Sequence, residues 1–300
     1  MTPSSQRGRI EAGVWDIPLA DYVADPCVEP SLSASIAKVL VNPTKTPAHA
    51  KLLHPRFTAQ PVREFNAVPN FGSAVHALAF GGPKVVALDY KDWRKDDAQK
   101  ERAAVLAAGD VPLLAKDMAR AQKCCGAALL ALYTLDIAWA FEKTLVWKAS
   151  GVWHRCRPDA HHMMRIIVDL KVTQTDPPDA NRQFFNQDED MQAAFVEAGC
   201  DALDPGGRGR RKIFYLYVED DEPFVARMLP VSEATLTIAR KRRIAATNIW
   251  RQCITANKWP TGSLMLPPSE RPNRNEAAWL AREINEPHLV EEMEDERAST

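Results

Sequence analysis

The residues best suited to chemistry lie in one short stretch, where Arg157-Pro158-Asp159 is followed ten residues later by Asp169-Leu170-Lys171. Apolar and more polar residues alternate from Ile166 to Val172, a period of two that predicts a β-strand. Asp169 and Lys171 are two positions apart and should point to the same face of that strand. Two carboxylates beside an ammonium group favour a site for a hard cation and a phosphate.

The same residues also have a plain structural interpretation. Asp159 could be a turn residue after Pro158, and Asp169 with Lys171 could be a surface ion pair. Such exposed pairs are common and contribute little to stability. The two interpretations differ in what surrounds the pair, so the neighbouring elements matter.

Three further polar residues belong to elements that could reach this strand. His76 follows the small residues of Gly72-Ser73-Ala74 in a predicted helix, and a neutral imidazole can bind a metal. Glu142 opens a predicted strand, and Gln192 lies on a later helix. Each has an alternative: a packed helix histidine, a carboxylate at the surface end of a strand, and a polar residue on a half-exposed helix.

The hydrophobic pattern predicts helices first and a mixed region afterwards. Three consecutive strands are expected over 142–148, 152–157 and 165–173, followed by a helix over 179–198 and strands over 212–218 and 224–229. His161 and His162 fall in the expected turn between two of these strands, so we expect both to be exposed. Helices are expected over 32–40, 44–53, 71–80, 96–108, 113–139 and 232–256, the last with Ser232 as its cap.

These elements predict three segments along the chain. Residues 1–30 should form a partly ordered arm, and 261–300 a Pro-rich and acidic tail that is loosely held or disordered. Residues 31–260 should form one domain, with a helical region over 31–140 and an α/β core over 141–260.

The order helix, three strands, helix, strand resembles the core of the PD-(D/E)xK nuclease superfamily over about residues 70–230. In particular, the chain is similar to phage and prophage recombination exonucleases, such as exodeoxyribonuclease VIII, and to RecB-type nuclease domains. The family's last motif commonly ends in Tyr, where this chain has Phe195 and therefore no hydroxyl. The matching positions are His76, Glu142, Asp159, Asp169, Leu170, Lys171 and Gln192.

The resemblance implies an α/β fold with a restriction-endonuclease-like core, a central mixed sheet flanked by helices, and an N-terminal helical region. Cleavage of a phosphodiester needs an activated water and neutralisation of negative charge, which two hard cations can supply. We expect Mg²⁺ or Mn²⁺, two ions in all, held by His76, Asp159, Asp169 and the Leu170 carbonyl.

The resemblance also implies roles for the remaining residues. Lys171 would orient the attacking water and offset phosphate charge. Glu142 would order a water molecule on the metal. Gln192 would hold the scissile phosphate or the surroundings of Lys171.

The expected activity is a DNA exonuclease acting 5′→3′ on double-stranded ends and leaving 3′ single strands for an annealing protein. A ring-shaped homo-oligomer is expected by analogy with related exonucleases. A structure-specific or single-strand nuclease on the same core is an alternative. A non-catalytic DNA-binding or assembly subunit is another.

Charge and cysteine usage narrow the class further. The formal net charge is −1, so nucleic acid must be bound by local patches rather than by a global basic field. Arg208, Arg210, Arg211 and Lys212 form one candidate patch in a glycine-containing loop, and 240–243 form a second on the last helix, although either could be solvated surface.

The 6 cysteines form no C-x-x-C pair, which argues against a zinc or iron–sulfur site and favours reduced, mostly buried thiols. No apolar run reaches the roughly 18 residues of a membrane span, and the start of the chain lacks the apolar core of a signal peptide. We therefore expect no membrane partner and a cytoplasmic location.

Overall fold

The computed structural model describes residues 9–58, 71–174, 180–262 and 273–285. Contacts divide the chain into two units, Met1–Thr261 and Gly262–Thr300. The second unit contains helix α10 (Asn273–Asn285). Within the described residues, no helix is both long enough and apolar enough to cross a membrane.

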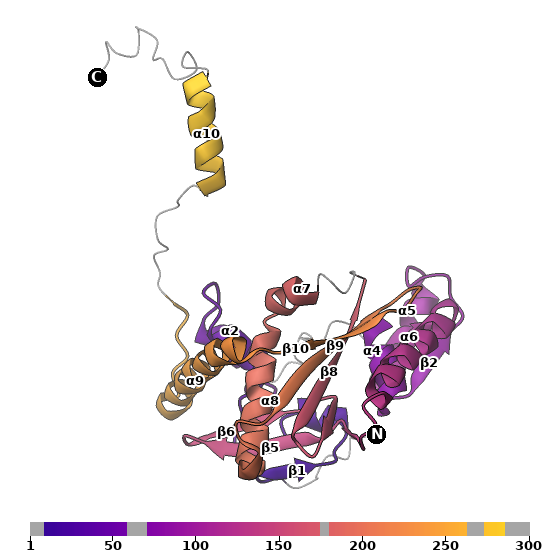
Figure 1. Ribbon diagram of the computed structural model, residues 1–300, viewed down its shortest axis with the longest axis horizontal. Coiled ribbons are helices and arrows are strands. Elements are labelled where there is room, and N and C mark those ends of the chain that lie inside the picture. Colours follow the sequence, from indigo (N-terminus) through magenta and orange to yellow (C-terminus); the bar gives the residue numbers. More distant parts are fainter. Residues whose placement is uncertain (1–8, 59–70, 175–179, 263–272, 286–300) are drawn as a thin grey trace. The chain divides into compact units, whose positions relative to one another are not determined.

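The first unit begins with mainly helical elements and continues into a mixed region (Figure 1). Its helices are α1 (Leu19–Val23), α2 (Ala34–Leu40), α3 (Pro47–Leu53), α4 (Phe71–Phe80), α5 (Asp96–Ala107), α6 (Ala115–Tyr133), α7 (Ala180–Asn186), α8 (Glu189–Leu203) and α9 (Glu233–Ala256). Its strands are β1 (Gly13–Trp15), β2 (Val85–Leu88), β3 (Val111–Leu114), β4 (Ala140–Phe141), β5 (Thr144–Ala149), β6 (Val152–Cys156), β7 (Ala160–His162), β8 (Ile166–Thr173), β9 (Lys212–Glu219) and β10 (Ala226–Pro230).

The central sheet has 5 strands in the order β10-β9-β8-β7-β4. β8 and β9 are parallel, and the other neighbouring pairs are antiparallel, so the sheet is mixed as predicted. The register places Asp169 opposite Tyr215 and Lys171 opposite Tyr217. Smaller sheets join β1, β5 and β6, and β2 with β3.

A single bent hairpin links the central sheet to the sheet of β1, β5 and β6. One arm runs through β4 and β5, and the other through β6 and β7. Both arms are interrupted, the first at residues 142–143 and the second at 157–159. Each arm therefore changes sheet at a polar break, and these breaks hold Glu142 and Asp159.

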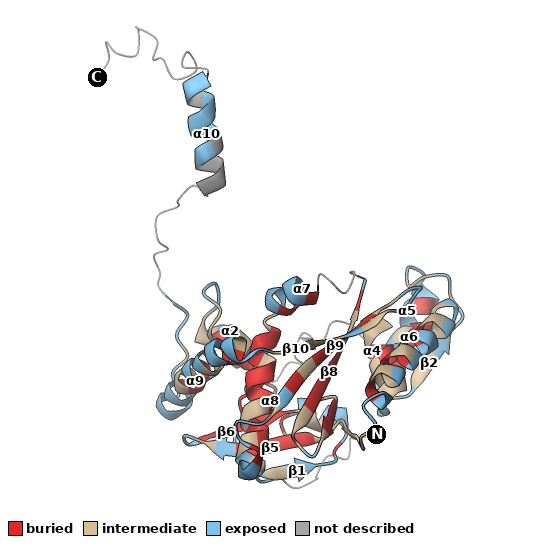
Figure 2. Cartoon of the chain, viewed as in Figure 1, coloured by how far each residue is buried: buried red, intermediate tan, exposed pale blue. Residues whose placement is uncertain are grey.

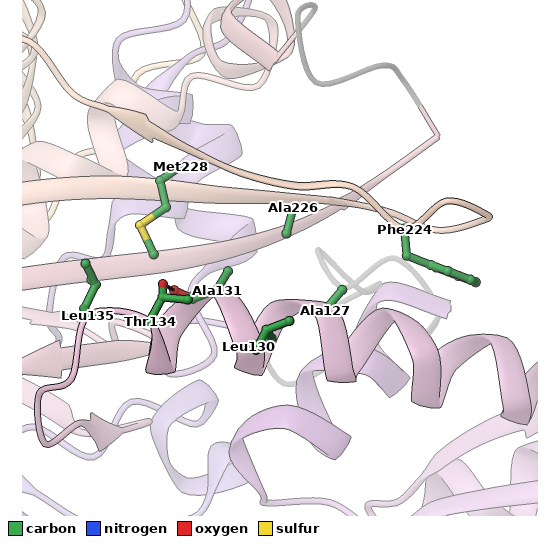
Figure 3. Close-up of a pocket in the computed structure, with 8 residues that line it drawn as sticks. All are labelled: Ala127, Leu130, Ala131, Thr134, Leu135, Phe224, Ala226 and Met228. Carbon is green, nitrogen blue, oxygen red and sulfur yellow. Dashed lines mark hydrogen bonds between the residues drawn. The ribbon is translucent and has the colours of Figure 1, made fainter.

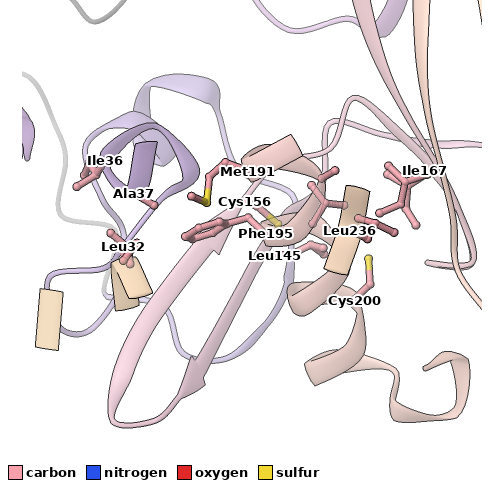
Figure 4. Close-up of a cluster of buried hydrophobic side chains, with 14 of the residues drawn as sticks. Leu32, Ile36, Ala37, Leu145, Cys156, Ile167, Met191, Phe195, Cys200 and Leu236 are labelled. Atoms are coloured by element: carbon pink, nitrogen blue, oxygen red, sulfur yellow. The ribbon is translucent and has the colours of Figure 1, made fainter. Parts of the chain in front are cut away.

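Buried apolar clusters cover both faces of the central sheet (Figure 2). On one face, Phe195 of α8, Ile167 of β8 and Ile36 of α2 belong to one buried cluster (Figure 4). On the other, Leu170 packs with residues of α4 and α6, including Ala74 and Cys124. Full burial of a large apolar side chain stabilises the fold by about 1.5–3 kcal/mol. The strand carrying Asp169 and Lys171 is thus held from both sides.

Local signals explain two helix ends. The Ser232 hydroxyl accepts a hydrogen bond from the Thr235 N–H at 3.2 Å, which confirms the predicted cap of α9. Asp188 takes a left-handed conformation with φ 52°, and it separates α7 from α8. The single helix predicted over 179–198 is therefore wrong.

Other predictions also need correction. The apolar start of the helix predicted over 113–139 is part of β3, because four apolar residues fit a buried strand as well as a helix. The described part of the predicted partly ordered arm contains two short elements, β1 and α1, which do not contradict that prediction. His161 and His162 lie in β7 rather than in an exposed turn, and His161 is buried.

All 6 cysteines are free and buried, as predicted. Part of the predicted C-terminal tail is helical, since α10 lies within it. Residues 263–272 and 286–300 of that tail are outside the described residues.

Candidate active site

Asp159 lies at the second break of the bent hairpin, directly before β7. Its Oδ2 accepts a hydrogen bond of 2.6 Å from the Leu170 backbone N–H, and its side chain is 13% exposed. This contact fixes the carboxylate against the middle of β8. The predicted pairing of the two motifs is therefore a direct contact.

His76 reaches the same point from α4. Its Nε2 lies 2.9 Å from the Leu170 carbonyl oxygen, and its Nδ1 lies 3.6 Å from Asp159 Oδ2. Only a protonated Nε2 can donate to a carbonyl. Burial lowers the pKa of His76, which favours the neutral ring. In that tautomer, Nδ1 carries a lone pair facing Asp159, as a metal ligand requires.

Glu142 lies at the first break, where its backbone is left-handed with φ 53°. Its N–H donates to the Asp159 carbonyl at 2.9 Å, so the two breaks are joined. The Arg157 Nε donates to Glu142 Oε2 at 2.5 Å, and Arg157 Nη1 donates to the carbonyl of Ile17 at 2.8 Å. Arg157 thus positions the Glu142 carboxylate. Glu142 does not open a strand as predicted, but lies between β4 and β5.

Three possible ligand atoms, one from each of His76, Glu142 and Asp159, lie within 4.8 Å of one another. Imidazole and carboxylate donors suit Mn²⁺, and carboxylates suit Mg²⁺. Burial raises the pKa of Asp159 well above its usual range, and the charges of Asp169 and Glu142 raise it further. Burial likewise raises the pKa of Glu142. A divalent cation would relieve this crowding of negative charge, so the residues fit the predicted metal.

Asp169 forms the second half of the site. Its Oδ2 lies 2.6 Å from Lys171 Nζ, and its Oδ1 accepts a 2.5 Å hydrogen bond from Gln192 Nε2. Asp169 is only 5% exposed, so the pair with Lys171 is not a surface ion pair. Burial opposes the charge on Lys171, but the carboxylates of Asp169 and Glu189 outweigh it and raise the pKa of Lys171.

The structure divides the predicted metal ligands. Asp169, a predicted ligand, is not a member of the three-residue cluster. Glu142 is a member, although it was predicted only to order a water molecule. The Leu170 carbonyl accepts the His76 hydrogen bond, and its role as a metal ligand stays a prediction. Gln192 contacts Asp169 directly, so its role toward a phosphate stays a prediction.

Sequence reasoning missed two charged residues at this site. Glu189 Oε2 lies 3.4 Å from Lys171 Nζ and 3.8 Å from Lys38 Nζ. Glu189 is three positions before Gln192 on α8, and that spacing places both side chains on one helix face. The spacing was therefore a usable signal for Glu189. Lys38 had none, because α2 is far from α8 in the sequence.

The predicted basic patch is only partly exposed. Arg208, Arg210 and Lys212 are exposed. The Arg211 side chain is 1% exposed, and its Nε donates to Asp201 Oδ1 at 2.6 Å while Nη2 donates to the Cys200 carbonyl at 2.7 Å. Its guanidinium makes these contacts inside the protein, and DNA contact by Arg211 stays a prediction. Arg240, on the second basic segment, pairs with Glu197 and Glu233.

An open hollow of about 480 Å³ lies between α6 and the region of β10 (Figure 3). Apolar side chains line it almost entirely, among them Leu130, Phe224 and Met228. Thr134 is its one polar lining residue. The hollow therefore lacks the groups needed for chemistry and is separate from the ionic site.

Comparison with known proteins supports the fold. No model of a protein family matches the chain, and no curated protein matches its sequence. An inferred exonuclease from Eubacterium rectale superposes with a TM-score of 0.57, covering 88% of this chain and 98% of its own, at 12% identity. The chain therefore shares the mixed α/β fold of this structure.

Weaker similarities involve two further solved structures. A phage-related exonuclease from Haemophilus somnus 129PT has a TM-score of 0.32 and 13% identity, covering 62% of this chain and 95% of its own. An alkaline exonuclease from Laribacter hongkongensis has a TM-score of 0.29 and 12% identity, covering 69% of this chain and 98% of its own. Scores this low add nothing to the superposition above.

Proposed function

We propose that this protein is a Mg²⁺- or Mn²⁺-dependent deoxyribonuclease that acts as an exonuclease. One observation carries the proposal: a cluster of possible metal ligands and a buried ion pair come together at β8. His76, Glu142 and Asp159 gather at the Leu170 end of the site, and a buried Asp169–Lys171 pair lies beside them.

Divalent cations bound there would neutralise phosphate charge and lower the pKa of a water molecule. His76, Glu142 and Asp159 would hold a cation, with Asp169 as the ligand of a second ion. The Lys171 ammonium would donate to the scissile phosphate and orient the attacking water. Arg157 keeps Glu142 in place, and Gln192 keeps Asp169 in place.

The finer activity rests on the family resemblance. We propose degradation 5′→3′ from double-stranded DNA ends, with 3′ single strands as the product and a single-strand annealing protein as the next partner in recombination. A ring-shaped homo-oligomer around the duplex and a cytoplasmic location belong to the same proposal.

The test is degradation of a linear duplex labelled at either the 5′ or the 3′ end. Early release of the 5′ label as mononucleotide, in Mg²⁺ or Mn²⁺ and not in EDTA, is the expected result. Release of the 3′ label first would reverse the polarity, and cutting of a closed circle would indicate an endonuclease. Binding of duplex without any cleavage in either metal would indicate a non-catalytic DNA-binding subunit.

A further inference from the structure

Glu189 is a buried carboxylate at the start of α8 with no part in the metal cluster. Its side chain is 5% exposed, and its backbone carbonyl accepts a 2.8 Å hydrogen bond from the Tyr215 hydroxyl. Tyr215 is paired with Asp169 in the sheet register. The first turn of α8 is thus tied to the strands that carry the site, and Glu189 Oε2 lies 3.4 Å from Lys171 Nζ.

Lys38 contacts the same carboxylate oxygen of Glu189 as Lys171 does. Its Nζ donates to the Gln187 carbonyl at 2.8 Å and lies 3.8 Å from Glu189 Oε2. The neighbouring residues Ile36, Ala37 and Val39 are buried in the same core cluster as Phe195 of α8. Packing of α2 against the core therefore places the Lys38 ammonium, from the N-terminal region, beside the site.

Lys171 is held between two carboxylates, Asp169 at 2.6 Å and Glu189 at 3.4 Å. A metal ion bound to Asp169 would neutralise part of the negative charge that otherwise attracts the Lys171 ammonium. The bound cation would also repel the Lys171 ammonium, because neighbouring like charges repel strongly in a poorly solvated site. Glu189 is then the remaining carboxylate that can keep Lys171 in position.

We propose that Glu189 is a positioning residue that holds the Lys171 ammonium in the active site when cations occupy it, and that Lys38 balances the Glu189 carboxylate. α2, outside the region of family resemblance, would then contribute to catalysis. This inference rests on the proposed nuclease function.

The kinetic test compares Glu189→Gln with Glu189→Asp, and Lys38→Met with Lys38→Arg. Glu189→Gln should slow single-turnover cleavage by about tenfold to a hundredfold, the scale of a misplaced catalytic group. The KM for DNA and Mn²⁺ affinity measured by calorimetry should stay within about twofold. Glu189→Asp and Lys38→Arg should recover most of the rate, and Lys38→Met should lose less than Glu189→Gln.

Lys45→Met is the matched control, because Lys45 is an exposed lysine in the loop after α2. It should cleave at the wild-type rate. An unchanged rate in Glu189→Gln would overturn the proposal. A fall in Mn²⁺ affinity that matches the fall in rate would also overturn it, because Glu189 would then be a metal ligand.

A second measurement does not need cleavage. The ¹⁵N-resolved NMR signal of the Lys171 ammonium should persist in the wild type when Mg²⁺ is added, and should broaden or disappear in Glu189→Gln. A signal that responds identically to Mg²⁺ in both proteins would overturn the proposal. This result does not depend on DNA hydrolysis. A wild type without nuclease activity would refute the proposed function, and the NMR comparison would still decide whether Glu189 positions Lys171.

Discussion

The Asp159 carboxylate accepts a hydrogen bond from the Leu170 N–H over 2.6 Å, and the Leu170 carbonyl lies 2.9 Å from His76 Nε2. One peptide unit of β8 and its neighbour thus hold both a carboxylate and an imidazole. This relationship brings together residues from three separate elements, α4, the hairpin break and β8. It also places Asp159 where its charge is poorly solvated.

Asp159→Asn should abolish hydrolysis, with a loss of at least about 10²-fold, because a metal-binding charge is removed. In EDTA the same variant should be more stable than the wild type. The folded protein raises the pKa of Asp159, so the ionised carboxylate disfavours folding at neutral pH. Asn removes that charge and can still accept the Leu170 hydrogen bond. Thermal unfolding in EDTA checks this sign, and a lower Tm would contradict it.

Metal affinity should depend on pH in a defined direction. The pKa values of Asp159 and Glu142 are both raised, chiefly by burial, so protons compete with the cation above the ordinary carboxyl range of about 4. Mn²⁺ should bind more tightly as pH rises, with release of protons. Calorimetry in buffers of different ionisation enthalpy counts those protons. Binding that is independent of pH and releases none would show that the cluster is already ionised.

Lys171→Ala should separate metal binding from chemistry. The ammonium contacts Asp169 and is not a ligand, so Mn²⁺ affinity should survive. The single-turnover rate should fall by about 10²-fold or more, the scale of a lost charge-stabilising group. Calorimetry and single-turnover cleavage on the same preparation provide the comparison. Parallel losses of affinity and rate would point to collapse of the site.

The basic loop should divide into surface and structural arginines. A variant with Arg208 and Arg210 changed to Ala should bind DNA more weakly, and each lost phosphate contact should reduce the salt slope by about 1. Its Mn²⁺ binding should be unchanged. An unaltered salt slope would place the DNA elsewhere, with the helix around Arg240–Arg243 as the next candidate.

Arg211→Ala should instead lower stability. The change leaves Asp201 and the Cys200 carbonyl without their buried partner, a kind of loss that costs about 3–5 kcal/mol. Urea denaturation measures this difference. Normal stability combined with a reduced salt slope would show that Arg211 acts at the surface.

Asp25 anchors the N-terminal segment through a buried ionic network. Its carboxylate contacts His54 at 3.1 Å and Arg155 at 3.3 Å, and accepts a 2.7 Å hydrogen bond from Ser31 Oγ. Burial opposes its charge, but the hydrogen bond from His54 and the charge of Arg155 prevail and hold the pKa of Asp25 well below its usual range.

Asp25→Asn should therefore destabilise the fold by about 3–5 kcal/mol at neutral pH. The wild-type contribution is present above the unfolded pKa of about 3.9 and is lost as pH falls toward the folded value. The two proteins should thus converge in stability in acid. Asp136→Asn is a matched control, because Asp136 is exposed and, like Asp25, has a left-handed backbone. Equal stability of Asp25→Asn and the control would contradict this account.

Local spacing was enough to predict several features of this protein. Alternation over Ile166–Thr173 placed Asp169 and Lys171 on one face, because side chains on a strand repeat every two residues. Turn and cap residues bounded α4 and α9 correctly. The order of these elements resembles the PD-(D/E)xK core, and that resemblance implied the mixed sheet that the structure shows.

Tertiary packing decided the rest, because each remaining contact joins residues far apart in the chain. His76 and Leu170 are separated by 94 positions, and the Arg211 guanidinium bonds Asp201 and the Cys200 carbonyl of α8 and the Met164 carbonyl before β8. Lys38 meets Glu189 because α2 packs against the core that contains α8. No local period encodes such meetings. They depend on which apolar faces pack together, and that choice fixed the chemistry of the site.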